Sequence, residues 1–453
     1  MRRSGLALIV ASSLLFCQAA GAGTRPHYGG TVRTAMSAAP VSLDPVEQGG
    51  SPAAANLSRL IFDTLVELDE RGAPQPGLAA SWEAEPGYQR WQFHLRPGVA
   101  FDDGTPMTPE AVAASLRAAN ASWTVSAATD GVIIVRAAAA PDLPAELALA
   151  RNSIAKRGAG KVHGTGPFTI AQWDPAKRLV LAAREDYWRG RPFVNSIEIE
   201  LGKSLREQMI SLDLGKLDVI EVAAEQARQA TAEGRRVTSS LPVELVALVF
   251  TKEAESADDS KLREALALSL DRGALNRVFL QSGAEPAGGL LPVWMTGYSF
   301  VFPAAVDLDR ARQVRAGLRQ AAPWTLGYDS ADGLSRLLAE RIALNARDAG
   351  LNVQLANSGS SDIRLVRMRL PSLDSRTALA LLASGLGLPQ PKFENDSAQD
   401  LYSAESALLQ SHRVIPLLHL KTNYATSSNL RNFAATRDGN WDISNAWLAT
   451  ERP

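Results

Sequence analysis

Histidines and carboxylates are the side chains most suited to acid–base or metal chemistry, but their spacing here matches no known motif of that kind. His412 and His419 are separated by a predicted helix end and by Pro416, so they do not share one helix face. The sequence contains neither H-E-x-x-H nor G-x-S-x-G. Asp102 and Asp103 are adjacent in a predicted turn, where neighbouring side chains diverge. We therefore predict a protein that is not an enzyme, with no catalytic residues, metal site or cofactor.

A glycine-rich stretch at residues 163–168 (HGTGPF) has the composition of a phosphate-binding loop, a hinge or the start of a strand. It lacks the Lys-Ser/Thr pair that follows the glycines in a P-loop, which argues against phosphate binding. Gly164 and Gly166 are expected to supply backbone geometry that other residues resist, and Pro167 is expected to stiffen the turn.

The remaining polar and aromatic residues in predicted loops are candidates for contact with a ligand in a cleft. One group follows the first predicted strand, one is an aromatic pair after residue 186, and one lies in a Gly/Pro-rich loop that could overhang a cleft. Each group has a structural alternative, because an aspartate before proline commonly shapes a turn and an aromatic pair commonly packs a surface. The predicted ligand-binding residues are Ser42, Leu43, Asp44, Tyr187, Trp188, Trp294 and Tyr298.

A basic strand is predicted at residues 361–371. We expect Arg364, Arg367 and Arg369 to share one face of this strand with Asp362. Such a face could clamp an acidic ligand, and the alternative is an ion-paired or solvated face.

The elements that must position these residues alternate between short β-like runs and amphipathic helical patterns, which predicts an α/β fold. Residues 91–95 (WQFHL) alternate as a half-buried strand does. Thr108, Pro109 and Glu110 are typical of a helix start, with a hydroxyl at the N-cap, proline at the first position and a carboxylate in the first turn.

Composition fits an ordinary globular protein. The chain has 453 residues, of which 46% are hydrophobic and 21% are charged, and this length favours about two or three domains. A net charge of −1 provides no basic field for nucleic acid or anionic lipid. We therefore expect no nucleic-acid partner.

The first residues have the pattern of an export signal. Arg2 and Arg3 precede an apolar run that is too short to span a bilayer well, and Ala20-Gly21-Ala22 is a small-residue cleavage site. We expect residues 1–22 to be a signal peptide cleaved near Ala22, with a membrane anchor as the alternative. The single cysteine, Cys17, lies in this segment; its lipidation is the minor alternative, because Phe16 stands where lipoproteins favour a small residue.

Several ordered segments across roughly residues 28–448 resemble the family 5 extracellular solute-binding proteins of ABC importers, the oligopeptide- and dipeptide-binding group. The most recognisable is residues 91–108 (WQFHLRPGVAFDDGTPMT). The others are residues 28–33 (YGGTVR), 40–45 (PVSLDP), 61–66 (IFDTLV), 76–82 (PGLAASW), 164–168 (GTGPF) and 258–272 (DDSKLREALALSLDR).

The resemblance implies a type II periplasmic-binding-protein-like fold, with two α/β lobes, a hinge and a small inserted domain. We expect lobe 1 to be discontinuous, with residues 23–50, 158–245 and 415–453. The inserted domain is expected at residues 51–157 and lobe 2 at residues 246–414.

The resemblance also implies an exported, periplasmic receptor that captures a peptide or other small polar solute between its lobes and delivers it to membrane permease subunits. A monomer is expected. Residues 249–252 (VFTK) lack the asparagine of the family pattern, and its second-lobe aspartate motif is not found. The alternatives are a sensor or scaffold that does not transport and has lost peptide recognition, and a receptor for a metal or metallophore.

Overall fold

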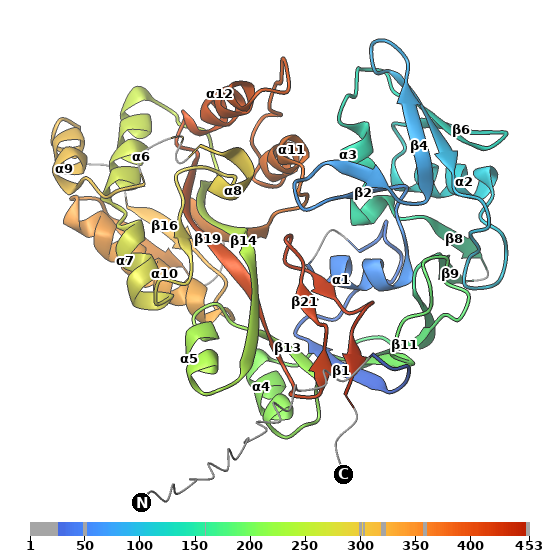
Figure 1. Cartoon of the computed structure of the whole chain (residues 1–453). Helices are drawn as coiled ribbons and strands as arrows, with labels where there is room; N and C mark the ends of the chain where they lie inside the picture. The colour runs from blue at the N-terminus through green and yellow to red at the C-terminus, as the bar shows by residue number, and fades with distance from the viewer. Residues whose placement is uncertain are drawn as a thin grey trace, which may run out of the picture.

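One mixed sheet runs through the molecule and joins its two lobes (Figure 1). In the computed structural model, residues 26–48, 52–158, 160–298, 301, 304–318, 323–356 and 360–449 are described. The predicted signal peptide and Cys17 lie outside the described residues. From edge to edge the strands are β10 (Phe168–Asp174), β11 (Arg178–Ala183), β12 (Ser196–Leu201), β1 (Thr31–Met36), β13 (Val219–Val222), β19 (Val414–Thr426), β14 (Arg236–Phe250), β18 (Ile363–Arg369), β16 (Trp324–Gly327) and β17 (Val353–Ala356), and β15 (Glu285–Pro286) pairs with β19.

Strands β14 and β19 connect the lobes. They pair antiparallel from Arg236 opposite Thr426 to Val249 opposite Val414. At one end β19 also pairs with β13, and at the other end β14 also pairs with β18. The ladder shifts register on both sides of Pro242, a residue with no N–H to donate. The pairing of the two strands is therefore irregular where one lobe gives way to the other, and a further shift follows between Val246 and Ala247.

Lobe 1 lies at the lower right of β14 and β19 in Figure 1, and these two strands are called the hinge strands below. Its sheet has a parallel centre, since β1 is parallel to both β12 and β13. Apolar side chains such as Ile197 and Leu181 pack under α1 on one face, and Ile220 packs against α4 and α5 on the other. The remaining elements are α1 (Pro52–Ile61), α4 (Leu205–Asp213), α5 (Ala227–Ala232), β20 (Leu430–Arg431), β21 (Ala434–Ala435), β22 (Trp441–Asp442) and β23 (Trp447–Leu448).

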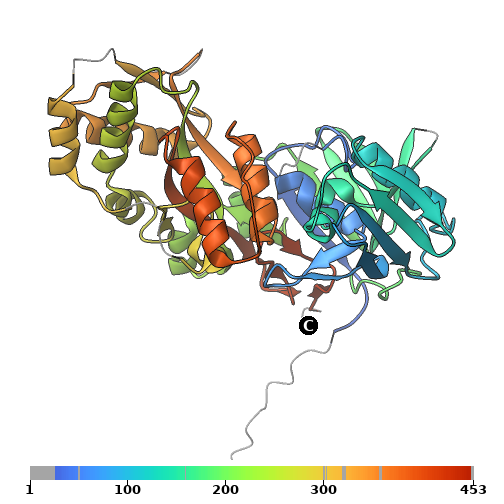
Figure 2. The same ribbon diagram turned by 90° about the horizontal axis from the view of Figure 1, so that it is seen from above.

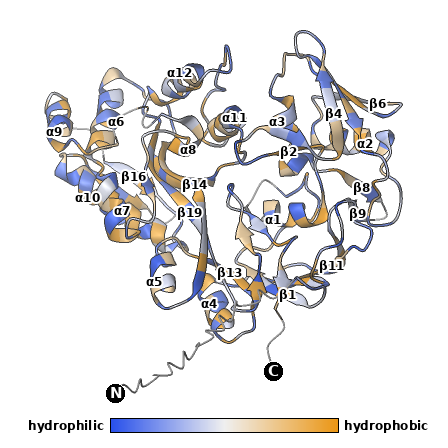
Figure 3. Cartoon of the chain, in the orientation of Figure 1, coloured by the Kyte–Doolittle hydropathy of each residue, from blue (hydrophilic) through white to orange (hydrophobic). Residues whose placement is uncertain are grey.

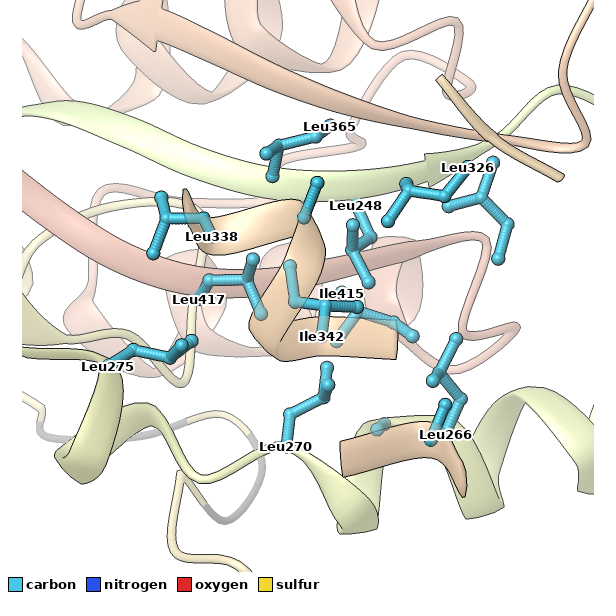
Figure 4. Close-up of a cluster of buried hydrophobic side chains, with 14 of the residues drawn as sticks. Leu248, Leu266, Leu270, Leu275, Leu326, Leu338, Ile342, Leu365, Ile415 and Leu417 are labelled. Atoms are coloured by element: carbon cyan, nitrogen blue, oxygen red, sulfur yellow. The ribbon is translucent and has the colours of Figure 1, made fainter. Parts of the chain in front are cut away.

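Lobe 2 places helices on both faces of its part of the sheet (Figure 2). Figure 4 shows one of its two cores, in which Leu248 and Leu365 from strands meet Leu338 and Ile342 from α10. The second core lies under α8, α11 and α12. The helices are α6 (Ala257–Ser269), α7 (Arg272–Phe279), α8 (Val293–Thr296), α9 (Leu308–Ala316), α10 (Gly333–Asp348), α11 (Ser375–Gly385) and α12 (Ala398–Leu409). They carry both polar and apolar faces (Figure 3), as helices that cover a sheet do.

A smaller unit at the upper right of Figure 1 has its own antiparallel sheet, in the order β4-β5-β7-β6. Trp91 and Phe93 alternate into its core, as the sequence predicted for a half-buried strand. The elements of this unit are β2 (Val66–Leu68), β3 (Pro74–Pro76), β4 (Ala79–Ala84), β5 (Arg90–Leu95), α2 (Pro109–Ala119), β6 (Thr124–Ala128), β7 (Gly131–Val135), α3 (Leu143–Leu147), a 3-10 turn (Ala150–Asn152), β8 (Ala155–Gly158) and β9 (Lys161–Gly164).

The predicted start of α2 is confirmed, because the Thr108 hydroxyl accepts a hydrogen bond of 3.3 Å from the Ala111 amide. Helix α1 belongs to the core of lobe 1, where Leu57, Leu60 and Ile61 are buried, although it falls within the segment predicted to be inserted. The domain boundaries remain a prediction.

The glycine-rich stretch returns the chain to lobe 1 beneath the end of α1. A β-carbon on Gly164 would lie 1.9 Å from the Ile61 carbonyl oxygen, and one on Gly166 would lie 2.7 Å from the same oxygen. Neither glycine is among those with positive φ. These glycines are thus required by a close backbone approach and not by a special backbone dihedral angle.

Candidate functional site

Tyr187 and Trp188 hold the start of the smaller unit to lobe 1. The Tyr187 hydroxyl and the Trp188 indole donate to the two carboxylate oxygens of buried Asp63, over 3.0 and 2.9 Å. Burial, with the Asp63 charge in addition, raises the pKa of Tyr187 well above its ordinary value. The Arg96 and Arg189 guanidinium groups lie over the Trp188 ring, at 4.8 and 4.3 Å from its centroid. The polar atoms of this predicted pair are therefore used within the fold.

Ser42, Leu43 and Asp44 lie at the junction with the β8 strand. The Asp44 carboxylate accepts two hydrogen bonds from Arg157, one of them 2.7 Å long, and Leu43 is buried in the lobe 1 core. Burial alone would raise the pKa of Asp44, but the hydrogen bond from Arg157 holds it below its ordinary value. Asp44 also accepts from the Val46 amide at 3.0 Å, as an aspartate in a turn does.

Trp294 and Tyr298 lie together in lobe 2. The Trp294 indole donates to the Pro242 carbonyl at 2.8 Å, and the Tyr298 hydroxyl donates to Glu405 at 2.6 Å. The Arg437 guanidinium, from the segment between β21 and β22, lies 5.8 Å from the Trp294 ring centroid. Trp294 thus contacts the hinge strand β14 and the C-terminal segment at the same time.

The predicted ligand-binding residues therefore lie in three places: the β8 junction, the Asp63 contact and the α8 region of lobe 2. Among them only Trp294 contacts the boundary between the lobes through the interactions described above. Ligand contact by any of them stays a prediction.

The smaller unit touches lobe 2 directly. Asp142, before α3, forms an ion pair of 3.3 Å with Arg376 of α11, and Arg376 also pairs with Asp396 of its own lobe. The turn between β2 and β3 packs against the start of α11, where a β-carbon on Gly72 would lie 2.4 Å from the Leu373 carbonyl oxygen. Arg437 donates to the Glu70 carbonyl in the same turn at 2.7 Å.

This contact is expected to weaken as pH rises. Burial raises the pKa of Asp142 to about 6, with the Arg376 charge opposing the shift and Asp374, Asp396 and Glu146 adding to it. In water the pKa of an aspartate carboxyl is about 3.9. Because the pKa of Asp142 is higher in the contact, protonation of Asp142 stabilises the contact fully at pH values below the pKa in water. That contribution is lost as pH rises through about 6. Small-angle X-ray scattering is expected to show a larger radius of gyration at pH 7 than at pH 5.

Asp142→Asn is the matched variant for that measurement, because it keeps the shape and removes the charge. It should abolish the change in radius between pH 5 and pH 7. An equal change in this variant would contradict the role of Asp142.

Hydrogen-bonded polar groups gather where the lobes join. Arg59 of α1 forms an ion pair with Asp438, and the Asn440 amide donates to Asp438 at 2.9 Å. Burial raises the pKa of Tyr424 to about 12, and its hydroxyl donates to the Gly439 carbonyl at 2.7 Å. The segment between β21 and β22 is thereby fixed over the hinge strand β19.

Two arginines of β18 join this region. Arg367 makes paired hydrogen bonds of 2.9 Å to Glu244 and one of 2.7 Å to Asp332. Arg369 donates to the Thr422 hydroxyl at 2.7 Å and to the Asn440 side chain at 3.4 Å.

The prediction that Arg364 shares their face is wrong. Strand residues alternate between faces, and Arg364 is exposed between Ile363 and Leu365, which are both in the core. For the same reason Asp362 is not on the face of Arg367. The ion-paired alternative applies to Arg367.

Glu221 of β13 is a residue that sequence reasoning missed. It lies directly opposite Tyr424 in the sheet. Its side chain keeps exposed surface, yet burial by surrounding protein raises its pKa. A single carboxylate in the apolar run VIEV was the signal that could have identified it.

Two pockets lie away from this region. One is a small pocket formed by residues of lobe 2 that include Tyr298 and His419. Burial lowers the pKa of His419 to about 4. The other is an open groove on lobe 1 lined by charged residues such as Arg33 and Glu198.

Within the described ranges, no three His, Cys, Asp or Glu side chains gather as a metal site. No helix in the same ranges has the length and apolar character needed to cross a bilayer.

Comparison with known proteins gives concordant matches. Residues 73–392 match the family model described as bacterial extracellular solute-binding proteins, family 5 Middle. The chain is 27% identical to Protein XP55 of Streptomyces lividans over 335 residues, which are 65% of this chain and 61% of that protein. It is 24% identical to the nickel-binding periplasmic protein of Escherichia coli over 358 residues, 67% of each. The chain thus spans about three fifths to two thirds of these relatives.

The structure is similar to that of a dipeptide-binding protein from Pseudoalteromonas sp. SM9913 in complex with Met-Leu. The TM-score is 0.79 at 15% identity, over 92% of this chain and 100% of that chain. At this identity the likeness establishes a common fold.

Proposed function

The chain belongs to the bacterial extracellular solute-binding proteins of family 5, and we propose from this membership that it is the substrate-binding receptor of an ABC-type importer. It captures a peptide or other small polar solute between its two lobes. The predicted fold class, a type II periplasmic-binding-protein-like α/β fold, is confirmed by the structural match. The proposed partners are a small-molecule or peptide ligand and the permease subunits of a membrane importer.

The two long strands shared by both lobes are the observation that supports this proposal most strongly. Strands β14 and β19 each begin in one lobe and end in the other. A rotation of one lobe relative to the other about these strands therefore brings the lobes together without breaking the core of either lobe. The polar groups of Glu221, Arg369 and Asp438 lie near this point.

The energy of ligand binding is sufficient for such closure. A ligand of micromolar affinity contributes about 8 kcal/mol. Shifting an equilibrium from 1:99 to 99:1 requires about 5.5 kcal/mol of differential affinity. A ligand that contacts both lobes can therefore close the receptor without any catalytic step.

We place the receptor in the periplasm, exported by the predicted signal peptide and acting as a monomer without a catalytic role. Its proposed units keep the predicted boundaries with two changes. The buried position of Leu57 and Ile61 favours counting α1 with lobe 1, and the position of Ile415 and Leu417 in the lobe 2 core favours counting the first half of β19 with lobe 2. Of the predicted ligand-binding residues we favour Trp294, because it contacts Arg437 across the boundary.

A metallophore receptor is the second candidate. The relative named a nickel-binding periplasmic protein favours it. A metal complex that brings its own ligands would need no metal-ligating cluster from the chain.

A thermal-shift panel tests the proposed function. Peptides, amino acids, sugars and nickel–histidine are added to the protein at millimolar concentration. A solute at about 100 times its Kd adds about 2.7 kcal/mol to stability, so we expect a clear rise in melting temperature with at least one class. Stabilisation by no class would contradict the receptor and favour the scaffold alternative.

A further inference from the structure

One carboxylate of lobe 2 is buried without a counter-ion. Glu405 of α12 has no exposed surface, and no cation among the described residues forms an ion pair with it. Its oxygens instead accept from the Leu290 amide, from the Leu291 amide at 3.0 Å and from the Tyr298 hydroxyl at 2.6 Å. Burying a charge without a counter-ion is costly, so packing alone does not account for a carboxylate at this position.

The chain that Glu405 bonds to is the turn before α8. His419 of β19 donates from Nε2 to the Leu290 carbonyl at 3.0 Å, so both backbone polar groups of Leu290 bond to side chains. These side chains supply the partners that a strand would find in a sheet, because residues 287–292 lie in no strand or helix. A β-carbon on Gly289 would lie only 2.8 Å from the Glu405 carboxylate. The turn is therefore fixed closely between α12 and β19.

Helix α8 follows this turn and carries Trp294 to the hinge. The Trp294 indole donates to the Pro242 carbonyl of β14 at 2.8 Å, and the ladder between the hinge strands shifts on both sides of Pro242. A side chain of lobe 2 thus bonds to the hinge strand where its pairing is interrupted. The Arg437 guanidinium of lobe 1 lies near the same indole ring. The position of α8 is therefore linked both to the hinge and to lobe 1.

We propose that Glu405 is a positioning residue that sets the balance between the open and closed arrangements of the lobes. It holds the turn before α8, and the turn holds the Trp294 indole on the hinge strand and within reach of Arg437. Only interactions that differ between two states shift their equilibrium, and the contact of Trp294 with Arg437 is lost when the lobes separate. Glu405 therefore favours the closed arrangement without any contact to a ligand. This inference rests on the proposed function only in that lobe closure is the working motion of the receptor.

Glu405→Leu removes the acceptor and is studied without added solute. Hydrogen exchange measured by mass spectrometry reports on the turn and α8. Single-molecule energy transfer between labels at Val135→Cys and Leu344→Cys, in the protein without its predicted signal peptide, reports on the lobes. We expect faster exchange across residues 289–298. We also expect the ratio of the short-distance to the long-distance population to fall by about 5-fold, a typical effect of one lost neutral hydrogen bond.

Glu405→Gln is the conservative variant, because its amide oxygen can still accept from both backbone amides of the turn. It should restore the native exchange and the native ratio of the two populations. Restoration shows that the hydrogen bonds of the side chain, and not its charge, position the turn.

Trp294→Phe tests the link between the turn and the hinge. Phenylalanine keeps an aromatic ring but has no indole N–H, so we expect the same fall in the ratio with native exchange across residues 289–291. The double variant of Glu405→Leu with Trp294→Phe should show no further fall, because both changes act through one bond. Trp91→Phe is the matched control, since the Trp91 indole donates to the Ala140 carbonyl at 3.2 Å within the smaller unit. It should leave the ratio unchanged.

Gly289→Ala keeps the test decisive if Glu405→Leu does not fold. The added β-carbon displaces the same turn and leaves the carboxylate in the chain, so it should also speed exchange and lower the ratio.

Three results would overturn the inference. Faster exchange with a native ratio in Glu405→Leu or Gly289→Ala would show that the carboxylate supports only the local fold. A native ratio in Trp294→Phe would exclude the link to the hinge, and a further fall in the double variant would show that the two residues act separately. None of these results depends on a solute, so the proposed receptor function fails on a different observation, the absence of any stabilising solute in the thermal-shift panel.

Discussion

Gly164→Ala is expected to destabilise the protein by about 4 kcal/mol or more, the range of the most severe single substitutions. The added β-carbon would lie 1.9 Å from the Ile61 carbonyl oxygen and 2.7 Å from the Phe62 ring. The carbonyl is fixed by a hydrogen bond of 2.9 Å from the Gly166 amide, so relief requires α1 to move away from the returning chain. Urea unfolding followed by tryptophan fluorescence measures the loss.

Gly158→Ala is the matched control. Gly158 belongs to β8, which pairs with the β9 strand that contains Gly164, and a β-carbon there would meet nothing within 4 Å. Its unfolding midpoint should stay close to the native value. A native-like midpoint for Gly164→Ala would show that the approach of the two segments is not as close as described.

Asp63→Ala is expected to reduce the free energy of unfolding by about 3 kcal/mol. The change removes the acceptor of both Tyr187 and Trp188. A buried donor left without an acceptor costs about 1–3 kcal/mol. Because these bonds connect the start of the smaller unit to residues after its end, we expect the melting temperature of the whole protein to fall, as measured by calorimetry.

Tyr187→Phe separates the two contributions, since it removes one donor and leaves the tryptophan bond. Its effect should be smaller than that of Asp63→Ala. Asp130→Ala serves as the control, because Asp130 is exposed and bonds only to the partly exposed His94 among the described side chains. Equal melting temperatures for Asp63→Ala and the control would contradict the anchoring role of Asp63.

Local sequence signals predicted much of the fold. The hydroxyl, proline and carboxylate at residues 108–110 define the start of α2 through contacts within one turn. The alternation of apolar and polar residues at 91–95 identified a strand, because this pattern too depends only on residues that are neighbours in the sequence. The reason for Gly164 was not predictable, because it depends on Ile61, which is distant in the chain and close only in the folded structure.

The candidate site was less predictable than the fold. Tyr187 and Trp188 are aromatic loop residues of the type that often contacts ligands, yet their polar atoms bond to Asp63, more than a hundred residues earlier. Glu221 could have been suspected from one carboxylate between valines. That burial raises its pKa is known only when the neighbouring strand β19 is in place.

The measurement that tests the account most directly is the distance between the lobes with and without ligand. Cys17, the single native cysteine, lies in the predicted signal peptide. The protein without residues 1–22 therefore permits specific labelling at Val135→Cys of the smaller unit and Leu344→Cys of lobe 2, both partly exposed. We predict two populations by single-molecule energy transfer, with the shorter distance increasing as the best solute of the thermal-shift panel saturates the protein. One unchanged distance at full saturation would contradict the claim that the lobes close on a ligand.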